Sequence, residues 1–289
     1  MKGLILKNSY YDPPFYRHGC ERIREELTRE GVTADLRDTS LFPLTSSGSV
    51  EWDNCDYDFC VYLDKDKYLS RLLSQKMRLF NSAEAVEICD DKMLTVERLA
   101  RLGFPLPATI PGLLCYRPEM DVPREFARTV GQKLGYPVIV KTAFGSMGKG
   151  VVKADTEEEL WRAMREVKTL PHLFQEYIAE SAGRDLRVIV VGGKVVGCME
   201  RRSDTDFRSN VGNGGRGIAV SCDDGVRDLA ESVANALGLD YCGIDLLFSQ
   251  SGMKVCEVNS NAFFEEFEKV TGINVAGAYA KHIVSEMKK

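Results

Sequence analysis

Hydrophobic and polar positions in the first part of the chain predict a strand, a helix and two further strands. Short apolar runs mark these strands at residues 3–8, 32–38 and 57–66. Between the first two, the segment 16–31 places Ile23 and Leu27 on one face of a helix. A helix between two strands favours parallel pairing, because the chain must cross over the sheet to return. The N-terminal part is therefore predicted to be an α/β domain with a parallel sheet.

The rest of the chain alternates between helical periodicity and strand-like runs joined by tight turns. Helical periodicity covers five segments, at residues 91–103, 122–135, 155–168, 224–238 and 274–289. Strand-like runs lie at residues 136–154, 172–178, 185–202 and 241–262, and a glycine-rich loop interrupts the first. Asp90 is expected to cap the first of these helices, and Thr156 with Glu159 has the spacing of a capping box. The pattern predicts an α+β region behind the N-terminal domain.

Prolines between residues 105 and 123 interrupt both periodicities. We therefore place a domain boundary near residues 88–106. Three segments are predicted: an N-terminal α/β domain at 1–88, a linker with a small subdomain at 89–176, and a C-terminal subdomain at 177–289.

The hairpin at 241–262 carries an acid in each of its apolar strands, Asp245 and Glu257. With a three-residue loop at 250–252, Asp245 faces Glu257, and Asn259 shares the face of Glu257. Opposed carboxylates repel each other unless a cation lies between them, and Mg²⁺ prefers such oxygens and shares its sites with phosphates. A magnesium site is therefore predicted; the alternative is a solvated sheet face with harmless acids.

The other hairpin turns at two central glycines, and a two-residue turn predicts that Asp185 faces Glu200. This register puts Arg187, Glu200 and Arg202 on one face and Arg201 on the other. Arginine suits bidentate binding of phosphate or carboxylate, so the hairpin is a candidate anion site. The alternative is an exposed hairpin held by salt bridges.

Two lysines and a glycine-rich loop are candidate phosphate ligands. Lys141 interrupts the apolar run YPVIVKTAF, where a buried ammonium is costly without an anionic partner. The loop Gly145–Gly150 follows it and offers backbone N–H groups, and Lys92 lies in the first turn of a predicted helix. Taken singly, these are a snorkelling edge lysine, an ordinary turn and a surface lysine. Beside a magnesium site, they favour bound phosphates.

Composition narrows the function classes. The 289 residues carry a net charge of −5, with 44% hydrophobic and 28% charged residues, which argues against a general nucleic-acid binder. No apolar run approaches the about 18–20 residues that span a bilayer, and the N-terminus is expected to be a strand rather than a signal peptide. The nine scattered cysteines and three separated histidines lack metal-ligand spacing. We expect reduced thiols in a cytoplasmic protein without membrane or nucleic-acid partners.

Seven motifs follow one another in the chain: CDDKMLT, VIVKTAFGSMGKGV, FQEYI, DLRVIVVGGKVVGCMERR, DFRSNVGNGG, GIDLLF and EVNSNAFFEEFEKVTGINVA. In this order they resemble the ATP-grasp ligases, and among them the RimK-type amino-acid ligases, which include ribosomal-protein glutamate ligases. The resemblance covers about residues 80–289 and extends more loosely to the N-terminal domain. It implies an α/β protein in which a Rossmann-like parallel-sheet domain precedes a two-subdomain, α+β ATP-grasp fold.

The resemblance also implies that ATP lies between the two α+β subdomains. The lysines would touch its phosphates, the glycine-rich loop would cover them, a hinge strand would border the adenine, and an acid would lie near the ribose. Within the hinge, Glu176 would approach the adenine amino group, and the backbone of Tyr177 and Ile178 would bond to the ring. The residues so placed are Lys92, Lys141, Gly145, Ser146, Gly148, Gln175, Glu176, Tyr177, Ile178 and Asp185.

Metal and catalytic roles follow from the same resemblance. Asp245, Glu257 and Asn259 match ligands of Mg²⁺, with Mn²⁺ as a substitute, in agreement with the hairpin register. A further set matches positions that face phosphates or the acyl intermediate: Arg187, Arg201 and Asn210.

The implied reaction joins a carboxylate-bearing acceptor, which is a small molecule, a peptide or a protein terminus, to an amino acid. The acceptor carboxylate attacks the γ-phosphate of ATP to form an acyl phosphate and releases ADP, and an amine then displaces phosphate to form an amide. Glutamate is the family default, and relatives often form homo-oligomers. Alternatives are an ATP-binding regulator without catalysis and a phosphotransferase.

One segment departs from the family pattern. NSNAFFEEF stands where the ribosomal-protein ligases carry a segment like NASPGLEG, so Phe263 and Phe264 replace a proline–glycine turn. This segment borders the acceptor side of the family's cleft, so an acceptor other than a ribosomal protein is expected.

Overall fold

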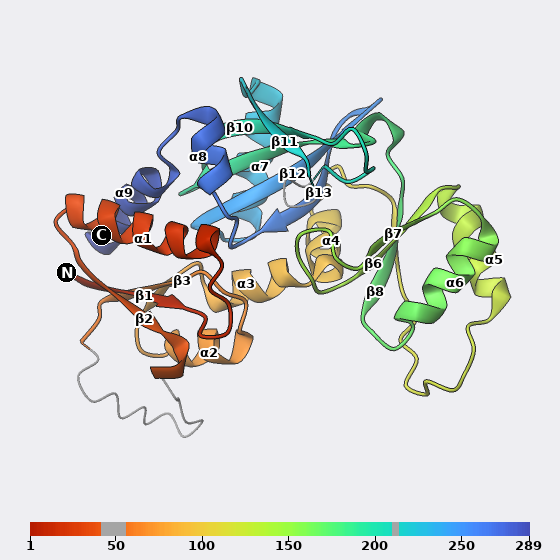
Figure 1. Cartoon of the computed structure of the whole chain (residues 1–289), viewed down its shortest axis with the longest axis horizontal. Coiled ribbons are helices and arrows are strands. Elements are labelled where there is room, and N and C mark those ends of the chain that lie inside the picture. Colours follow the sequence, from red (N-terminus) through yellow and green to blue (C-terminus); the bar gives the residue numbers. More distant parts are fainter. Residues whose placement is uncertain (42–55, 210–213) are drawn as a thin grey trace.

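Three β-sheets and the helices around them form the protein, shown in Figure 1 as a computed structural model. The structure describes residues 1–41, 56–209 and 214–289. The N-terminal and C-terminal sheets lie together, and a small sheet extends to one side of them (Figure 1). Each sheet draws its strands from a separate stretch of chain, at residues 2–80, 109–176 and 184–259. We retain the three predicted segments as a proposal, and the predicted α/β class is confirmed.

The N-terminal sheet is parallel throughout, as the strand–helix–strand pattern predicted. Its strands are β1 (Lys2–Lys7), β2 (Thr33–Asp38), β3 (Phe59–Tyr62) and β4 (Arg78–Phe80), in the order β2-β1-β3-β4. Its helices are α1 (Pro14–Arg29), the 3-10 turn η1 (Thr39–Leu41) and α2 (Lys67–Leu73). Helix α1 buries Ile23 and Leu27, as expected. The loops after β1 and β3 leave the carboxyl edge of the sheet, where α/β proteins bind ligands.

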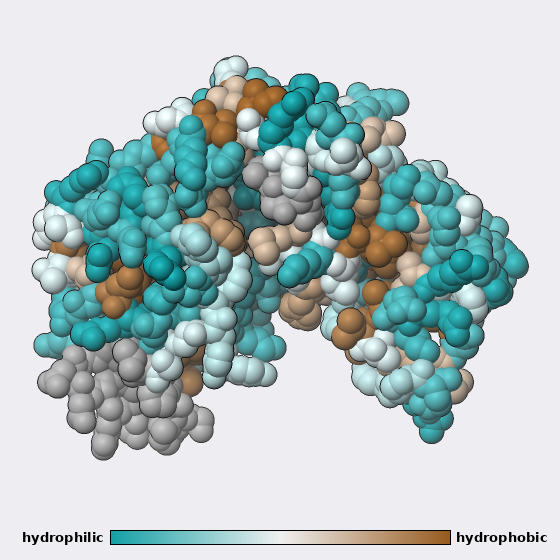
Figure 2. Space-filling model, in the orientation of Figure 1, coloured by the Kyte–Doolittle hydropathy of each residue, from teal (hydrophilic) through white to brown (hydrophobic). Residues whose placement is uncertain are grey.

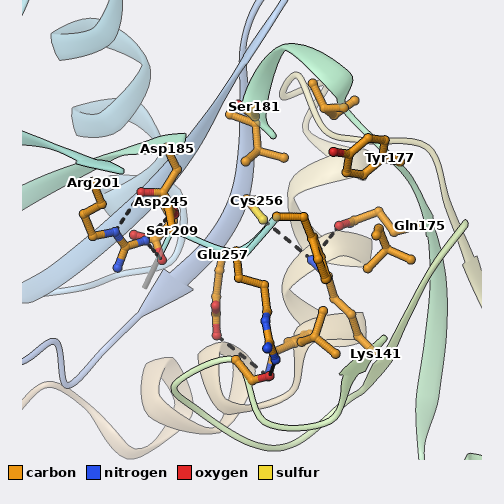
Figure 3. A pocket seen from close by; sticks show the side chains of 18 of the residues that line it. Lys141, Gln175, Tyr177, Ser181, Asp185, Arg201, Ser209, Asp245, Cys256 and Glu257 are labelled. Carbon is orange, nitrogen blue, oxygen red and sulfur yellow. Dashed lines mark hydrogen bonds and ion pairs between the residues drawn. The ribbon is translucent and has the colours of Figure 1, made fainter. Parts of the chain in front are cut away.

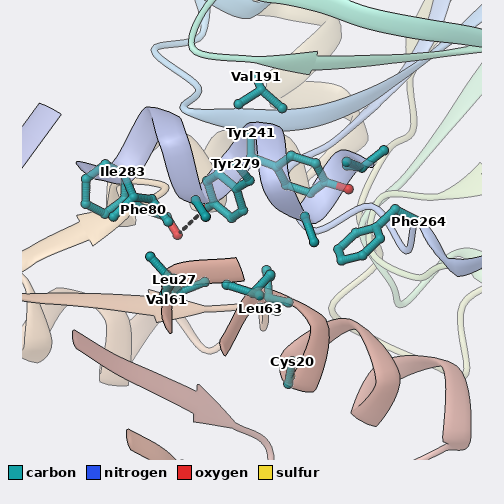
Figure 4. Close-up of a cluster of buried hydrophobic side chains, with 14 of the residues drawn as sticks. Cys20, Leu27, Val61, Leu63, Phe80, Val191, Tyr241, Phe264, Tyr279 and Ile283 are labelled. Atoms are coloured by element: carbon teal, nitrogen blue, oxygen red, sulfur yellow. Dashed lines mark hydrogen bonds between the residues drawn. The ribbon is translucent and has the colours of Figure 1, made fainter. Parts of the chain in front are cut away.

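The N-terminal sheet shares a hydrophobic core with the C-terminal part of the chain. Figure 4 shows Leu27 and Val61 in the same cluster as Tyr241 and Tyr279. The two tyrosine rings are stacked with their centroids 4.9 Å apart. The hydroxyl of Tyr279 also donates to the carbonyl of Phe80 at 2.8 Å, so residues from both ends of the chain stabilise one core.

Asn81, directly after β4, joins the same two parts by hydrogen bonds. Its side-chain amide donates to the carbonyls of Tyr241 and Ser260, each at 2.7 Å. Its side-chain oxygen accepts from the N–H of Tyr241 at 2.9 Å. Since the side chain is buried, these bonds fix the N-terminal sheet on the C-terminal one.

The small sheet is antiparallel and has a core of its own. Its strands β5 (Thr109–Pro111), β6 (Val138–Thr142), β7 (Val151–Ala154) and β8 (His172–Glu176) run in the order β5-β8-β6-β7. Its helices are α5 (Arg124–Leu134) and α6 (Glu157–Val167). Val140 and Phe174 lie in its core. Thr156 caps α6 by accepting from the N–H of Glu159, as predicted, but Glu159 reaches back to the N–H of Asp155.

The C-terminal sheet is antiparallel and carries most of the charged motifs. Its strands β9 (Arg184–Val191), β10 (Lys194–Arg202), β11 (Arg216–Val220), β12 (Tyr241–Ser249) and β13 (Gly252–Asn259) run in the order β11-β10-β9-β12-β13. Helices α7 (Asp224–Ala236), α8 (Glu265–Thr271) and α9 (Val275–Met287) accompany it, with the 3-10 turn η2 (Ala179–Ser181) at its start. None of the described helices has the length and apolar character needed to cross a bilayer.

Helices α3 (Ala83–Asp90) and α4 (Lys92–Arg101) connect the N-terminal sheet to the small one. The cap of α4 is Asp91, whose carboxylate accepts from the N–H groups of Met93 and Leu94. The prediction of Asp90 as the cap is therefore wrong. Asp90 ends α3 instead, and its carboxylate forms an ion pair with Lys65 at 2.9 Å.

The β12–β13 hairpin reaches the predicted pairing by another route. Ser249 pairs with Gly252, so the loop has two residues and the predicted three-residue loop is wrong. A bulge with Cys256 as the extra residue then shifts the register, and Asp245 pairs with Glu257 after all. Asn259 pairs with Gly243 at the end of the ladder.

A bulge also corrects the β9–β10 hairpin. Its turn has two residues as predicted, but the register shifts at Val196, so Asp185 faces Arg201 instead of Glu200. A one-residue shift exchanges the two faces of a strand. Glu200 therefore pairs with Arg184 and Arg202 on the face opposite Arg201, and the predicted grouping of Arg187 with Glu200 and Arg202 is wrong.

Candidate active site

A pocket of about 840 Å³, counted with the solvent at its mouth, opens between the small sheet and the C-terminal sheet. We call it the inter-sheet pocket. All ten residues that the sequence placed around a nucleotide line it, from both lysines to the hinge residues 175–178 and Asp185. Figure 3 shows that Lys141, Gln175 and Tyr177 enter from one side and Asp245, Cys256 and Glu257 from the other.

Lys141 points into this pocket from the middle of the small sheet. Its strand β6 lies between β8 and β7, which excludes the alternative of an edge lysine. The ammonium donates to the side-chain oxygen of Gln175 at 2.7 Å and lies 3.6 Å from the sulfur of Cys256 (Figure 3). No carboxylate pairs with it among the described residues, so this half-buried cation is available to an anionic ligand.

Lys92 begins α4 and brings a second ammonium to the pocket. It donates to the carbonyl of Gly145 at 2.8 Å and lies 3.7 Å from the carboxylate of Glu257. Burial lowers the pKa of Lys92, and the Glu257 carboxylate acts against this shift. An anionic ligand at this position would stabilise the charged form further.

The loop at residues 143–150 lies over the pocket in a glycine-dependent conformation. Gly145, Gly148 and Gly150 have φ of 129°, 72° and 72°, a region that side chains with a Cβ rarely adopt. The guanidinium of Arg208 donates to the carbonyl of Gly148 at 2.8 Å. With the bond from Lys92 to Gly145, two cations therefore hold this loop by its carbonyl groups.

The hinge side chains are already engaged. The carboxylate of Glu176 accepts from the ammonium of Lys254 and, at 2.8 Å, from the N–H of Ala108. These bonds hold the pKa of Glu176 below its ordinary value although burial acts to raise it. The proposed contact of Glu176 with an adenine amino group would have to compete with Lys254.

The bulge in β10 collects four charged side chains on one face of the C-terminal sheet. Arg201 donates to both oxygens of Asp185, at 2.7 and 2.5 Å, and lies 3.0 Å from Asp245. Arg187 binds both oxygens of Asp245, one of them at 2.9 Å. Burial acts to raise the pKa of Asp245, but the two guanidinium groups outweigh it and hold that pKa below its ordinary value.

The predicted magnesium ligands meet at the same place. Asp245 and Glu257 are paired across the ladder, and the side-chain nitrogen of Asn259 lies 3.5 Å from Asp245. Two carboxylates and an amide suit a hard divalent cation. Asn210 falls outside the described residues. No cluster of three or more acidic, histidine or cysteine ligands occurs within the described ranges, so the amide of Asn259 and the phosphates of a nucleotide would have to complete such a site.

A second cavity adjoins the inter-sheet pocket. It has about 1850 Å³ with the solvent at its mouth, and we call it the N-terminal cleft because residues of the first 65 positions form one wall. Four residues line both cavities: Ser146, Arg201, Asp245 and Glu257. Arg187 and Asn259 line the N-terminal cleft but not the inter-sheet pocket. The charged cluster therefore stands where the two cavities meet.

Several residues of the inter-sheet pocket were not identified from the sequence. Ile139 and Leu247 are apolar walls that lie two positions from Lys141 and Asp245, so strand periodicity would have found them. Arg208 and Phe207 come from the loop after β10, where no periodicity marks a position. Only the bond from Arg208 to the glycine-rich loop reveals its place.

Comparison with known proteins places the chain in a family. The family model of the RimK-like ATP-grasp domain matches residues 89–283. β-Citrylglutamate synthase B from Danio rerio is 38% identical over 239 residues, which are 81% of this chain and 55% of that protein. A probable α-L-glutamate ligase from Psychromonas ingrahamii is 37% identical over 218 residues, 73% of this chain and 69% of that protein.

The fold extends the likeness to the whole chain. A RimK domain ATP-grasp protein from Sphaerobacter thermophilus has a TM-score of 0.73 at 19% identity, covering 98% of this chain and 99% of that one. The chain spans little more than half the length of the citrylglutamate synthase, at 55%. The family model matches residues 89–283, a range that contains the residues of the inter-sheet pocket. This chain therefore belongs to the RimK-like ATP-grasp family.

Proposed function

We propose that the chain is an ATP-dependent carboxylate–amine ligase. The observation that carries this proposal is the place where the two cavities adjoin. Cations that could bind phosphates and a pair of carboxylates that could bind a metal lie there, at the inner end of the larger N-terminal cleft. A nucleotide in the inter-sheet pocket would direct its γ-phosphate toward this place. The cleft would bring the acceptor to the same point.

The position of each residue in the two cavities indicates its proposed role. The apolar side chains of Ile139 and Leu247 would enclose the base from both sheets, and Lys92 and Lys141 would bind phosphate oxygens. Arg187 and Arg201 would orient the acceptor carboxylate for attack on the γ-phosphorus. This attack would release ADP and leave an acyl phosphate. An amine would then attack its carbonyl carbon and release phosphate to form the amide. No protein nucleophile is required, so positioning and charge neutralisation carry the rate.

The metal ligands fit Mg²⁺ by type but are not free in this structure. Asp245, Glu257 and Asn259 would hold the ion, which supplies neutralisation of phosphate oxygens when bound, and Mn²⁺ has the same ligand preference. Because Arg187 and Arg201 engage Asp245, these arginines would have to turn toward the phosphates as the site fills. Lys92 would likewise exchange Glu257 for phosphate.

The substrates are proposed at the level of class. The names of the two similar proteins refer to glutamate, so glutamate is the first amino acid to test as the amine. The acceptor carries a carboxylate, and nothing in the proposal requires a nucleic acid. A homo-oligomer remains an expectation from the family.

The test is phosphate release from MgATP by the purified chain. Each of the twenty amino acids is supplied singly with a boiled, filtered extract of the source cells as acceptor pool, and positive wells are followed by mass spectrometry. We expect phosphate release that needs one amino acid, with a product mass of acceptor plus amino acid minus water. A stable phosphorylated product would instead indicate a phosphotransferase. ATP binding without release in any well would indicate a regulator.

A further inference from the structure

The outer part of the N-terminal cleft is aromatic. Tyr11, Phe15 and Tyr16 come from the N-terminal segment, and Phe263 comes from the loop after β13. The rings of Phe15 and Phe263 lie 4.8 Å apart edge to face, and those of Tyr11 and Tyr16 lie 5.5 Å apart. Tyr11 and Phe263 nevertheless remain 37% and 38% exposed. Large apolar surface is thus left open inside a cleft, which is the usual character of a ligand wall.

The lysines of the cleft are neutralised within the protein. Lys65 forms an ion pair with Asp90 at 2.9 Å, and Lys269 forms one with Glu265 at 2.7 Å. The two arginines at the inner end are held by acids in the same way. Within the described residues, the outer cleft therefore has no cation left to bind the several carboxylates of a compound such as citrate.

Two acids of the cleft are not neutralised. Asp64 follows β3 at the carboxyl edge of the N-terminal sheet, and Glu266 lies in the first turn of α8. Neither forms an ion pair within the part of the chain that the structure describes. Burial raises the pKa of Asp64 and outweighs the hydrogen bonds from the N–H of Lys65 and the side chain of Asn8, which act to lower it. Within the described residues, the outer cleft thus presents aromatic surface together with two carboxylates that form no ion pair.

We propose that the acceptor is an amphipathic cation: a carboxylate-bearing molecule with an aromatic or bulky apolar body and an ammonium or guanidinium group, as in a short peptide. This proposal rests on the ligase function above and names its substrate class. The apolar body packs on Tyr11 and Phe263, and the cation lies near Asp64 and Glu266. The carboxylate to be activated extends inward to Arg187.

The test uses hydroxylamine as a surrogate amine, so the natural amine need not be known. Its nitrogen attacks the acyl carbon, phosphate leaves, and the hydroxamate is measured as its ferric complex. Matched acceptors are N-acetyl-Lys-Phe, N-acetyl-Gln-Phe without the cation, N-acetyl-Lys-Ala without the ring, and citrate. We expect kcat/KM for N-acetyl-Lys-Phe to exceed each of the others by about tenfold, the size of one lost charge or ring contact.

Variants assign the preference to residues. Asp64→Asn and Glu266→Gln should each raise KM for N-acetyl-Lys-Phe several-fold and leave N-acetyl-Gln-Phe unchanged. Phe263→Leu, which keeps an apolar side chain against Phe15, should reduce the advantage of Phe over Ala. The matched controls are Glu97→Gln and Tyr116→Ala, a carboxylate and an exposed ring outside both cavities, which should change none of these ratios.

Binding measured by calorimetry with MgADP ranks the same four acceptors without turnover. A ranking with citrate equal to or above N-acetyl-Lys-Phe, or an unchanged lysine preference in both acid variants, would overturn the inference and leave the ligase standing. Hydroxamate from no acceptor despite ATP binding would overturn the ligase, and the inference with it.

Discussion

At the scale of single residues, Lys141 is the clearest candidate for a phosphate ligand. It reaches the pocket from an interior strand and is held by an uncharged partner, Gln175. A cation kept without a carboxylate in a half-buried place gains most from a phosphate, because its charge is not yet neutralised.

Lys141→Ala should therefore lower kcat/KM for ATP at least a hundredfold, about 2.7 kcal/mol of lost transition-state stabilisation. The measurement is phosphate release under the conditions that give a product. Lys133→Ala, at an exposed position of α5, is the control and should retain full activity. Near-normal turnover in the Lys141 variant would show that this lysine is misassigned.

Arg201 is a residue on which stability depends as well. Its buried guanidinium neutralises Asp185 and Asp245. Burial acts to lower the pKa of Arg201, but the two carboxylates outweigh it and hold that pKa above its ordinary value. Removing one partner of a buried pair leaves an uncompensated charge.

Arg201→Met should lower the free energy of unfolding by about 3–5 kcal/mol. The neighbouring Arg202→Met removes a half-exposed partner of Glu200 and should cost about 1 kcal/mol or less. Urea denaturation of both variants compares them directly. Equal losses would mean that the two faces of β10 are not as different as the register implies.

At the scale of elements, the two hairpins show what a sequence can predict. Their positions and the tight turn at Gly192–Gly193 follow from period-two alternation and turn residues. Their registers depend on bulges with Val196 and Cys256 as the extra residues, and neither of these is a glycine that would mark a bulge in the sequence. The bulge at Val196 places Arg201 on the face of Asp185, against the prediction. The bulge at Cys256 restores the predicted pairing of Asp245 with Glu257, although the predicted loop was one residue too long. Packing of the finished sheet decides such bulges, so local patterns do not reveal them.

The residues of the candidate site likewise fall into those that the sequence predicted and those that only the structure revealed. The motifs identified the residues on strands and at helix starts, because their neighbours fix their direction. The places of Asp64 and Arg208, and the contact of Phe263 with Phe15, became apparent only in the structure, where separate segments of the chain lie together. Loop residues carry no periodicity, and the partners that give them meaning are far away in the chain.

The glycine-rich loop gives a prediction at this scale. Gly148→Ala should weaken ATP binding several-fold, because an alanine at a φ of 72° costs about 1 kcal/mol and the loop would shift from the phosphates. Gly103→Ala carries a similar strain at the end of α4, with φ of 79° and open space around it, and should reduce stability only. Calorimetry with MgATP measures the affinities of both. An unchanged affinity in the Gly148 variant would remove the loop from the nucleotide site.

His172 in β8 adds a pH dependence. Burial lowers the pKa of His172 from its ordinary value of 6.5. The unfolded chain therefore takes up this proton first as the pH falls, so the free energy of unfolding should decrease as the pH falls below about 6.5. His172→Gln should flatten that dependence between pH 7.5 and 5.5, measured by urea denaturation. The same slope in both proteins would assign it to another group.

At the scale of the whole molecule, the shared core and Asn81 make the N-terminal and C-terminal sheets one cooperative unit, whereas the small sheet has a separate core. We expect two unfolding transitions. Trp52→Phe leaves Trp161 of α6 as the single tryptophan, which reports the small sheet by fluorescence while circular dichroism reports the whole chain.

Asn81→Ala should lower the main transition by about 1–3 kcal/mol, because two carbonyls and an N–H lose their buried partner, and should leave the tryptophan transition in place. A single transition seen by both probes, shifted together by the variant, would mean that the three sheets unfold as one.

The wall common to the two cavities has a thermodynamic consequence. Ser146, Arg201, Asp245 and Glu257 cannot rearrange for one ligand without changing the surface that the other meets. If the proposed function holds, binding of nucleotide and binding of acceptor would be linked: whatever factor ATP applied to the affinity for the acceptor, the acceptor would apply to the affinity for ATP. If the arginines leave Asp245 for phosphate when nucleotide arrives, the first ligand carries the cost of breaking those pairs, and the second enters a site that is already open. ATP would then bind weakly until its acceptor is present, and this would limit hydrolysis of ATP without ligation.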